Sequence, residues 1–327
     1  FAKDPRIITG ADGAYLIDDT GRRVFDSLSG LWCSGFGHNR EEIAAAVAEQ
    51  LRTLDYAPPF QYAHPKAIEL ADKLTAIAPE GLNHAFFTNS GSETADTSLK
   101  IARAYWRMCG QPTKTKLIGR AKGYHGVNFA GTSLGGIGGN RKLYGQLADA
   151  DHLPHTLLKE EAFTRGQPQG GEERADALED LIALHDASNI AAVIVEPMSG
   201  SAGVIVPPSA YLLRLRQLCS KHNILLIFDE VITGFGRTGG AFGSDTFGVV
   251  PDMMNLAKTL TNGAIPMGAV LARSEIYDAF LDASAPDHAI NLPHGYTYSG
   301  HPVASAAALA ALAIFENEDM PARARAL

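Results

Sequence analysis

Residues 190–195 read IAAVIV and residues 224–228 read ILLIF, and these two stretches decide the fold. Both are continuous apolar runs, and the first is rich in β-branched side chains, which is typical of strands buried on both faces of a sheet. A helix is expected between them, from Pro208 to His222. A strand, a helix and a second strand in this order indicate parallel strands joined by a crossover helix.

The same alternation extends along the chain on both sides of this unit. Residues 84–88 (HAFFT), 116–120 (KLIGR) and 268–272 (GAVLA) are further short apolar runs that predict strands. A helix is expected from about Gly91 to Cys109, directly after the first of them. Strands that alternate with helices predict an α/β fold with a mostly parallel central sheet and helices on both faces.

Other parts of the chain predict helices and loops. Apolar residues recur at helical spacing over residues 41–54, before the Pro58-Pro59 pair, and again over residues 65–78. Between residues 131 and 171 the pattern breaks down, and Gly, Pro and Ser gather in clusters such as GTSLGGIGGN. That composition predicts loops.

Composition and charge exclude several classes of function. The 327 residues are 46% hydrophobic and 20% charged, as in globular proteins, and the net charge of −8 argues against a nucleic-acid partner. The chain has an odd number of cysteines, Cys33, Cys109 and Cys219, which are too far apart for a disulfide framework or a metal site. We therefore expect no metal and a reducing compartment, the cytoplasm. No signal peptide is visible, and the longest apolar run, 303–315, is too short to span a membrane.

Ligands of open parallel sheets bind beyond the carboxyl ends of the strands. The strand predicted over residues 84–88 is followed by NSGSET (89–94). Ser90 and Glu93 fit a capping box, which would make this only a well-formed helix start. The same geometry also suits a phosphate, because Gly91 allows close approach and free N–H groups remain at the helix N-terminus. Neither a P-loop nor a dinucleotide fingerprint is present, which disfavours a nicotinamide dehydrogenase.

Two carboxylates, Asp229 and Glu230, end the apolar strand 224–228. A carboxylate buried there needs a cationic partner such as a guanidinium, a metal ion or a protonated heterocycle. Asp229 continues the inward-facing series and is expected to be functional. For Glu230 we expect a side chain that points into solvent.

Lys258 follows an apolar stretch, PDMMNLA (251–257), with few polar neighbours. A lysine near the end of an element commonly extends its amine into solvent. A desolvated lysine instead has a lowered pKa and can act as an amine nucleophile. A phosphate seat, the strand-end Asp229 and an imine-forming Lys258 together describe a site for pyridoxal 5'-phosphate (PLP).

Several motifs, in the right order, extend this interpretation to a family. They are IFDEVITGFGRTG (227–239) with its spacing to Lys258, NSGSET (89–94), GYHG (123–126) and HGYTYSGHP (294–302). Together they resemble the class III aminotransferases, which are fold-type I PLP enzymes, over nearly the whole chain. Within that family, AKTLTNGAIPMGAV (257–270) and LPHGYTYSGHP (292–302) look most like the ω-amino acid, or β-alanine, pyruvate transaminases.

The resemblance implies roles for individual residues. Lys258 would be the Schiff-base lysine and Asp229 the partner of the pyridinium nitrogen. The other cofactor contacts would be Gly91 and Ser92 at the phosphate, Tyr124 and Val231 on the two ring faces, and Thr297 from the second subunit of a dimer. Trp32, Tyr124 and Ser201 would line the substrate pocket, although Tyr124 and Trp32 also suit plain core packing. His125 and Glu196 are expected behind the cofactor, with a purely structural role equally open for His125.

Ser201 bears on the substrate, because the resemblance implies a glutamate at this position in relatives that use ornithine. A serine favours ω-amino acids or amines, with pyruvate as acceptor. The family's carboxylate-binding arginine is expected beyond Leu327. We expect residues 1–54 to begin a smaller α+β domain, 55–300 to form the large PLP-binding domain, and 301–327 to begin a connecting helix towards a C-terminal small domain that is missing here.

The sequence therefore predicts a PLP-dependent transaminase that moves an amino group from a β-alanine-like donor to pyruvate. The resemblance implies a homodimer, possibly paired into a tetramer, with the active site at the subunit interface. Three alternatives stay open: another amino donor such as GABA, putrescine or taurine; a racemase or aminomutase on the same scaffold; and a non-catalytic product that keeps only the fold.

Overall fold

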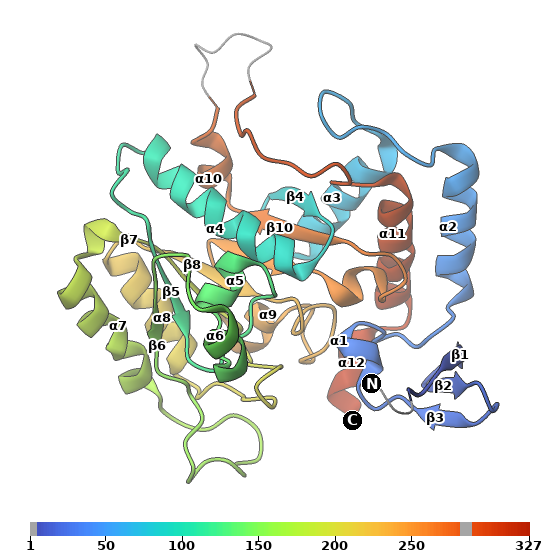
Figure 1. The fold of residues 1–327 in the computed structure, drawn as a ribbon, viewed down its shortest axis with the longest axis horizontal. Coiled ribbons are helices and arrows are strands. Elements are labelled where there is room, and N and C mark those ends of the chain that lie inside the picture. Colours follow the sequence, from blue (N-terminus) through green and yellow to red (C-terminus); the bar gives the residue numbers. More distant parts are fainter. Residues whose placement is uncertain (1–4, 282–289) are drawn as a thin grey trace.

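The computed structural model describes residues 5–281 and 290–327, and a seven-stranded sheet forms its centre (Figure 1). All neighbouring strands from β6 to β9 are parallel, whereas β10 runs antiparallel to both of its neighbours. In spatial order the strands are β4 (His84–Thr88), β10 (Gly268–Ala272), β9 (Met253–Leu256), β8 (Leu225–Asp229), β7 (Ile190–Val195), β5 (Lys116–Arg120) and β6 (Ala150–Leu153). The predicted α/β fold with a mostly parallel sheet is confirmed.

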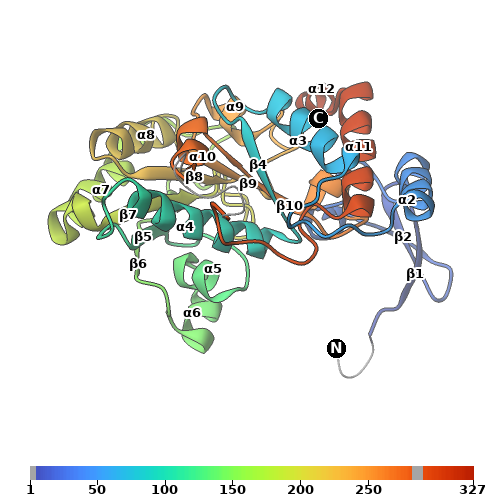
Figure 2. The same ribbon diagram turned by 90° about the horizontal axis from the view of Figure 1, so that it is seen from above.

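Helices cover both faces of this sheet, because successive strand residues point to opposite sides. On one face, α4 (Gly91–Met108) and α5 (Phe129–Leu134) pack on side chains such as Ile227 and Val270. On the other face, α7 (Glu172–His185) and α8 (Tyr211–Lys221) cover Leu226 and Phe228. Helices α3 (Pro65–Ile77) and α11 (Pro302–Asn317) cover the β9–β10 side of that face through residues such as Leu271. Figure 2 shows α5 and α6 on one side of the sheet and α3 and α8 on the other.

The helices have the following bounds. They are α1 (Ser29–Trp32), α2 (Glu41–Thr53), α3 (Pro65–Ile77), α4 (Gly91–Met108), α5 (Phe129–Leu134), α6 (Gly138–Tyr144), α7 (Glu172–His185), α8 (Tyr211–Lys221), α9 (Gly243–Phe247), α10 (Ser274–Asp278), α11 (Pro302–Asn317) and α12 (Met320–Ala326). Among the described residues, none of these helices combines the length and the apolar character needed to cross a membrane.

The N-terminal segment forms a separate antiparallel sheet at one side of the molecule (Figure 1). Its strands are β1 (Ile8–Asp12), β2 (Tyr15–Asp18) and β3 (Arg23–Phe25). The following helix α2 packs against α11, an alanine-rich helix that is buried along most of its length. Alanine side chains allow this close approach, since they occupy little space between neighbouring elements.

The expectation of loops over residues 131–171 was wrong in part. Helix α6 and strand β6 both lie in this segment. β6 reads ADHL and buries only Leu153, so it is a polar edge strand without the apolar run that marks the central strands. Helix α6 begins within the glycine cluster and has no side-chain N-cap. Local composition gave no signal for either element, because each depends on its place beside β5 or α5.

Candidate active site

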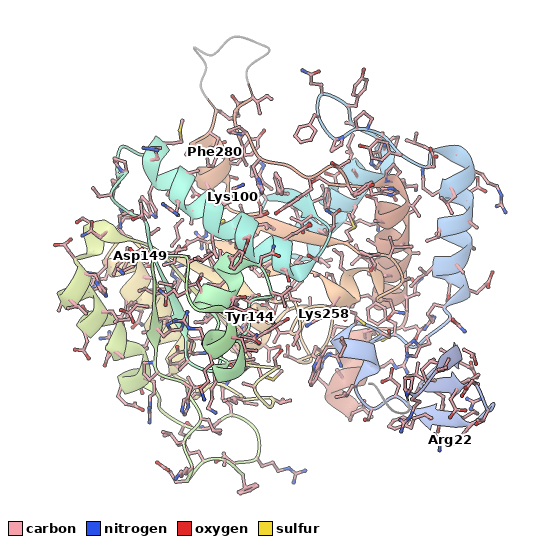
Figure 3. All side chains as sticks on the ribbon, in the orientation of Figure 1. Arg22, Lys100, Tyr144, Asp149, Lys258 and Phe280 are labelled. Carbon is pink, nitrogen blue, oxygen red and sulfur yellow. The ribbon has the colours of Figure 1, made fainter. Side chains whose placement is uncertain are left out.

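The carboxyl ends of β4, β7, β8 and β9 border a cavity of about 310 Å³. Its lining comes from distant parts of the chain, namely residues 89–92, Tyr124, Gly126, Glu196, residues 229, 231 and 232, and residues from 257 to 267. In Figure 3, Lys258 lies in the middle of the molecule, between the large sheet and the N-terminal segment. The parallel strands place this cavity where ligands of open α/β sheets bind.

One wall of the cavity is the N-terminus of α4. Ser90 Oγ accepts a hydrogen bond from Glu93 N (3.2 Å), and the Glu93 carboxylate accepts from Asn89 N (2.7 Å). This is the predicted capping box, except that the Glu93 carboxylate accepts from the N–H of Asn89 and not from the N–H of the N-cap residue Ser90. The N–H groups of Gly91 and Ser92 have no acceptor among the residues that the structure describes. They are open donors at the positive end of a helix, which suits an anion.

Glycines keep this wall accessible. A Cβ on Gly91 would lie 3.0 Å from a methyl carbon of Val231, and a Cβ on Gly126 would lie 2.5 Å from Ser92 Cα and Ser92 Oγ. Gly126 also has φ +87°, which disfavours any L side chain. Ser92 Oγ accepts from Val127 N (3.1 Å), so the 126–127 turn and the start of α4 support each other.

Asp229, which ends strand β8 and also lines the cavity, is 5% exposed. His125 is buried beside it, and its Nδ1–H donates to Asp229 Oδ2 (2.8 Å). The other oxygen, Oδ1, accepts from Val231 N (3.2 Å). Two donors therefore hold a negative charge in place inside the cavity wall, as an anionic partner for a buried cation requires.

Lys258 opens a short 3-10 turn (Lys258–Thr261) after β9 and has φ +53°, an uncommon conformation for a lysine. Burial lowers the pKa of Lys258, against the opposing pull of the negative charges on Asp229 and Glu196. A lowered pKa increases the share of neutral amine, which is the nucleophilic form. The backbone strain and the desolvated amine both mark this residue as a functional candidate.

Two further carboxylates lie beside the site. The carboxylate of Glu196 accepts from Tyr124 N (3.0 Å) and Gly200 N (3.1 Å), and burial raises its pKa. It thereby fixes the backbone of Tyr124. The expected solvent position of Glu230 was wrong, because its side chain is fully buried. It accepts from Gly243 N (2.7 Å), from Ser244 N (2.6 Å) and from a threonine hydroxyl, so α9 starts on this carboxylate.

The cavity thus brings together most of the residues singled out from the sequence, namely Gly91, Ser92, Tyr124, Asp229, Val231 and Lys258. Three other candidates are absent from its lining. Trp32 lies beside Thr259, with its carbonyl accepting from Thr259 Oγ1 (3.3 Å). Ser201 is exposed in a turn after β7. Thr297 is also exposed, and its carbonyl accepts from Tyr56 OH (3.0 Å).

The sequence analysis missed some of the lining. Gly126 belongs to the GYHG motif, but its own part in shaping the cavity emerges only from its contact with Ser92. Residues 265–267 (IPM) also line the cavity and carry no polar group that would have drawn attention. Apolar lining of this kind has no signal in a single sequence.

The fold and these side chains define an α/β enzyme whose site centres on a buried lysine and a buried aspartate. The model of the family described as aminotransferase class-III matches residues 2–327, and the chain belongs to this family.

Comparison with known proteins shows close relatives within the family. The chain is 67% identical to the beta-alanine–pyruvate aminotransferase of Pseudomonas aeruginosa over 321 residues, which cover 98% of this chain and 72% of that protein. It is 63% identical to the omega-amino acid–pyruvate aminotransferase of Pseudomonas putida over 322 residues, with the same two coverages. A solved amine transaminase from an uncultivated Pseudomonas species, in its PLP-bound form, has a TM-score of 0.90 at 44% identity, covering 97% of this chain and 72% of that one.

Proposed function

We propose that this protein is a PLP-dependent transaminase that transfers the amino group of a β-alanine-like ω-amino acid to pyruvate. One observation carries the proposal. A single cavity holds an anion seat at the α4 N-terminus, the Asp229 carboxylate and the desolvated Lys258 amine, which come from three separate parts of the chain. These are the three groups that PLP needs for its phosphate, its ring nitrogen and its aldehyde.

The residues present fit this cofactor. The phosphate would be held by the open N–H groups of Gly91 and Ser92, where a side chain at Gly126 would intrude. Tyr124 and Val231 line the same cavity, which suits the two residues proposed to lie on either face of a flat ring. Burial, together with the charge of Asp229, raises the pKa of Tyr124, so the phenol stays neutral.

When bound, PLP supplies an aldehyde that takes up the amino group and a ring that withdraws electrons from the adjacent carbon. The chain supplies the rest. Asp229, oriented by His125, would keep the facing ring nitrogen protonated and so strengthen that electron withdrawal. Lys258 Nζ, whose pKa is lowered by burial, would take a proton from the donor carbon and return it one position away. Pyruvate would then receive the amino group through the same residues acting in reverse.

The choice of substrate is supported by two relatives, at 67% and 63% identity, which are pyruvate aminotransferases of beta-alanine and of omega-amino acids. A putrescine–pyruvate aminotransferase of Pseudomonas aeruginosa is more distant, at 43% identity.

We further propose a homodimer in the cytoplasm, with Thr297 completing the phosphate seat of the neighbouring subunit. Thr297 is exposed and is absent from the lining of the cavity in its own subunit, which supports a role in a second copy. Light scattering of the PLP-loaded protein tests the dimer, and a monomeric holoenzyme would refute this arrangement.

The test of the function is the visible spectrum of the protein incubated with PLP, before and after addition of β-alanine without an acceptor. We expect a yellow band that bleaches with β-alanine and returns on addition of pyruvate, with alanine formed. The Lys258→Ala variant is the matched control, because it removes the amine while the rest of the cavity stays unchanged.

Other outcomes separate the alternatives. A band that bleaches only with another amine would keep the chemistry and change the donor. Turnover that needs no keto acid would indicate a racemase or an aminomutase. Failure to form any band with PLP would refute the enzymatic function.

A further inference from the structure

Arg120 ends strand β5 and is buried at the carboxyl edge of the sheet, with 1% of its surface exposed. Strands β5 and β7 are parallel neighbours, so Arg120 lies next to the turn that begins at Glu196, directly after β7. Its Nη2 donates to the backbone carbonyl of Glu196 (2.7 Å) and to Ser199 Oγ (2.7 Å). The side chain of Arg120 therefore holds this turn at two points.

The guanidinium of Arg120 is only partly compensated by these contacts. Within residues 5–281 and 290–327, its Nε and Nη1 have no hydrogen-bond acceptor. Its Cζ lies 5.6 Å from the centroid of the Tyr211 ring, whose face favours a cation. A buried charge is costly unless an opposite charge lies nearby, and the turn that Arg120 binds carries the buried carboxylate of Glu196.

Several charged groups act on Glu196. Burial raises the pKa of Glu196, His125 lowers it, the negative charge of Asp229 raises it, and Arg120 lowers it. Lys258 lines the same cavity, and the charge of Glu196 raises the pKa of that amine. An arginine keeps its positive charge throughout the working range of pH, unlike a histidine or a desolvated lysine. Arg120 is thus the permanent cation that favours the ionised form of Glu196.

The ionised form of Glu196 suits the two backbone N–H groups that bind it. Oε1 accepts from Tyr124 N (3.0 Å) and Oε2 accepts from Gly200 N (3.1 Å), so each oxygen faces a donor. Protonation would turn one of these oxygens into a hydroxyl group that faces an N–H group. The carbonyl of Arg120 also accepts from Gly123 N (2.9 Å), so the loop that leads to Tyr124 is held from both strand ends.

We propose that Arg120 is a positioning residue of the cofactor site: it keeps Glu196 ionised, and Glu196 in turn holds Tyr124 in the wall that receives the cofactor ring. The inference rests on the proposed PLP site and adds to it a residue that acts from behind. Arg120 is absent from the lining of the cavity, whereas Glu196 and Tyr124 both belong to it. Arg120 therefore acts on the cofactor through these two residues.

The test is a fluorescence titration of the cofactor-free protein with pyridoxamine 5'-phosphate, the amine form of the cofactor, which forms no imine with Lys258. Arg120→Gln keeps a hydrogen-bond donor and loses the charge. We expect it to raise the dissociation constant by about tenfold at about pH 6.5, the effect of losing one hydrogen bond to a charged group. The difference from the unmodified protein should shrink towards about pH 9, because Glu196 then ionises without the help of Arg120.

Two variants separate charge from shape. Arg120→Lys keeps the charge and should restore the pH dependence of the unmodified protein. Ser199→Ala is the matched control, because it removes one acceptor of the guanidinium and leaves both charges in place. An equal loss of affinity at every pH in Arg120→Gln, or the same pH dependence in Ser199→Ala as in Arg120→Gln, would overturn the proposal.

Thermal unfolding gives a second measurement that does not depend on the cofactor. The double variant Arg120→Gln with Glu196→Gln should lose less in Tm than the two single variants together, because it leaves no uncompensated carboxylate in the interior. If Arg120→Gln alone does not fold, a folded double variant supports the pairing in the same way, and additive losses contradict it. Failure of the unmodified protein to bind pyridoxamine 5'-phosphate at any pH would instead refute the PLP site and the proposed function with it.

Discussion

Replacement of Gly126 by alanine tests the phosphate seat most directly. The new Cβ would lie 2.5 Å from both Ser92 Cα and Ser92 Oγ, well inside van der Waals contact. Ser92 Cα is backbone at the start of α4, so it cannot move aside as a flexible side chain would. The residue would also have to keep φ +87°.

The magnitude follows from these two terms. An L residue in the left-handed region costs about 1–2 kcal/mol. Overpacking against a fixed backbone costs about 1–3 kcal/mol more. We therefore expect Gly126→Ala to lower the free energy of unfolding by about 2–5 kcal/mol. With an unfolding entropy of about 2.1 cal/mol/K per residue, a chain of 327 residues loses about 1.5 °C in Tm per kcal/mol, so Tm should fall by about 3–7 °C.

The same variant should weaken the cofactor site. Because Ser92 must shift, its N–H group no longer points towards the phosphate of PLP. The dissociation constant of PLP should therefore rise about tenfold or more. Thermal unfolding followed by circular dichroism and a fluorescence titration with PLP measure the two effects. Gly139→Ala is the control, since its Cβ would meet no atom within 4 Å and should leave Tm unchanged or slightly raised. Unchanged stability and unchanged PLP affinity in Gly126→Ala would refute this account of the wall.

Three further variants probe two residues of the site and His294, which contacts α4. Lys258→Ala should abolish amino transfer while circular dichroism shows an unchanged fold, and appreciable turnover would contradict the role of its amine. Asp229→Asn should still bind PLP but slow the first half-reaction by about a hundredfold or more, as expected when a fixed electrostatic partner is lost; an unchanged single-turnover rate would argue against it. The pKa of His294 is lowered by burial and by Lys100, whose Nζ donates to its Nδ1 (2.9 Å), so the folded chain resists protonation of this ring. Below the ordinary histidine pKa of 6.5 the unfolded chain binds a proton at this ring more readily than the folded chain does, so the protein loses stability as the pH falls below that value. Between about pH 7.5 and about pH 5.5, Tm of His294→Asn should therefore drop less than Tm of the unmodified protein. Equal drops would show that His294 makes no contribution.

The central sheet was predictable because strands that are buried on both faces need apolar side chains throughout. IAAVIV (190–195) is buried at every position, and this demand leaves a continuous signal in the sequence. Strand β9 was missed, although all of its residues are buried too. Its short MMNL segment lacks β-branched side chains and follows a proline, so its strand conformation depends on pairing with β8 and β10.

The site was predictable where a residue's chemistry is costly without a partner. A lysine after an apolar stretch and a carboxylate at the end of an apolar strand each demand an explanation, and both Lys258 and Asp229 line the cavity. Glu230 shows the limit of this reasoning. Its burial depends on α9, whose N–H groups turn towards the carboxylate from positions 243 and 244.

The sequence by itself determined the alternation of the most apolar strands with helices, the family, and the identity of the lysine and aspartate, because these depend on hydrophobic pattern and on local motifs. Tertiary structure alone decided which distant residues meet. His125 reaches Asp229 across 104 positions, and Arg237 lies over the ring of Trp32 from 205 positions away. Such contacts arise from the packing of loops at the edge of a sheet. Nothing in the local sequence shows which residues, far apart along the chain, will meet there.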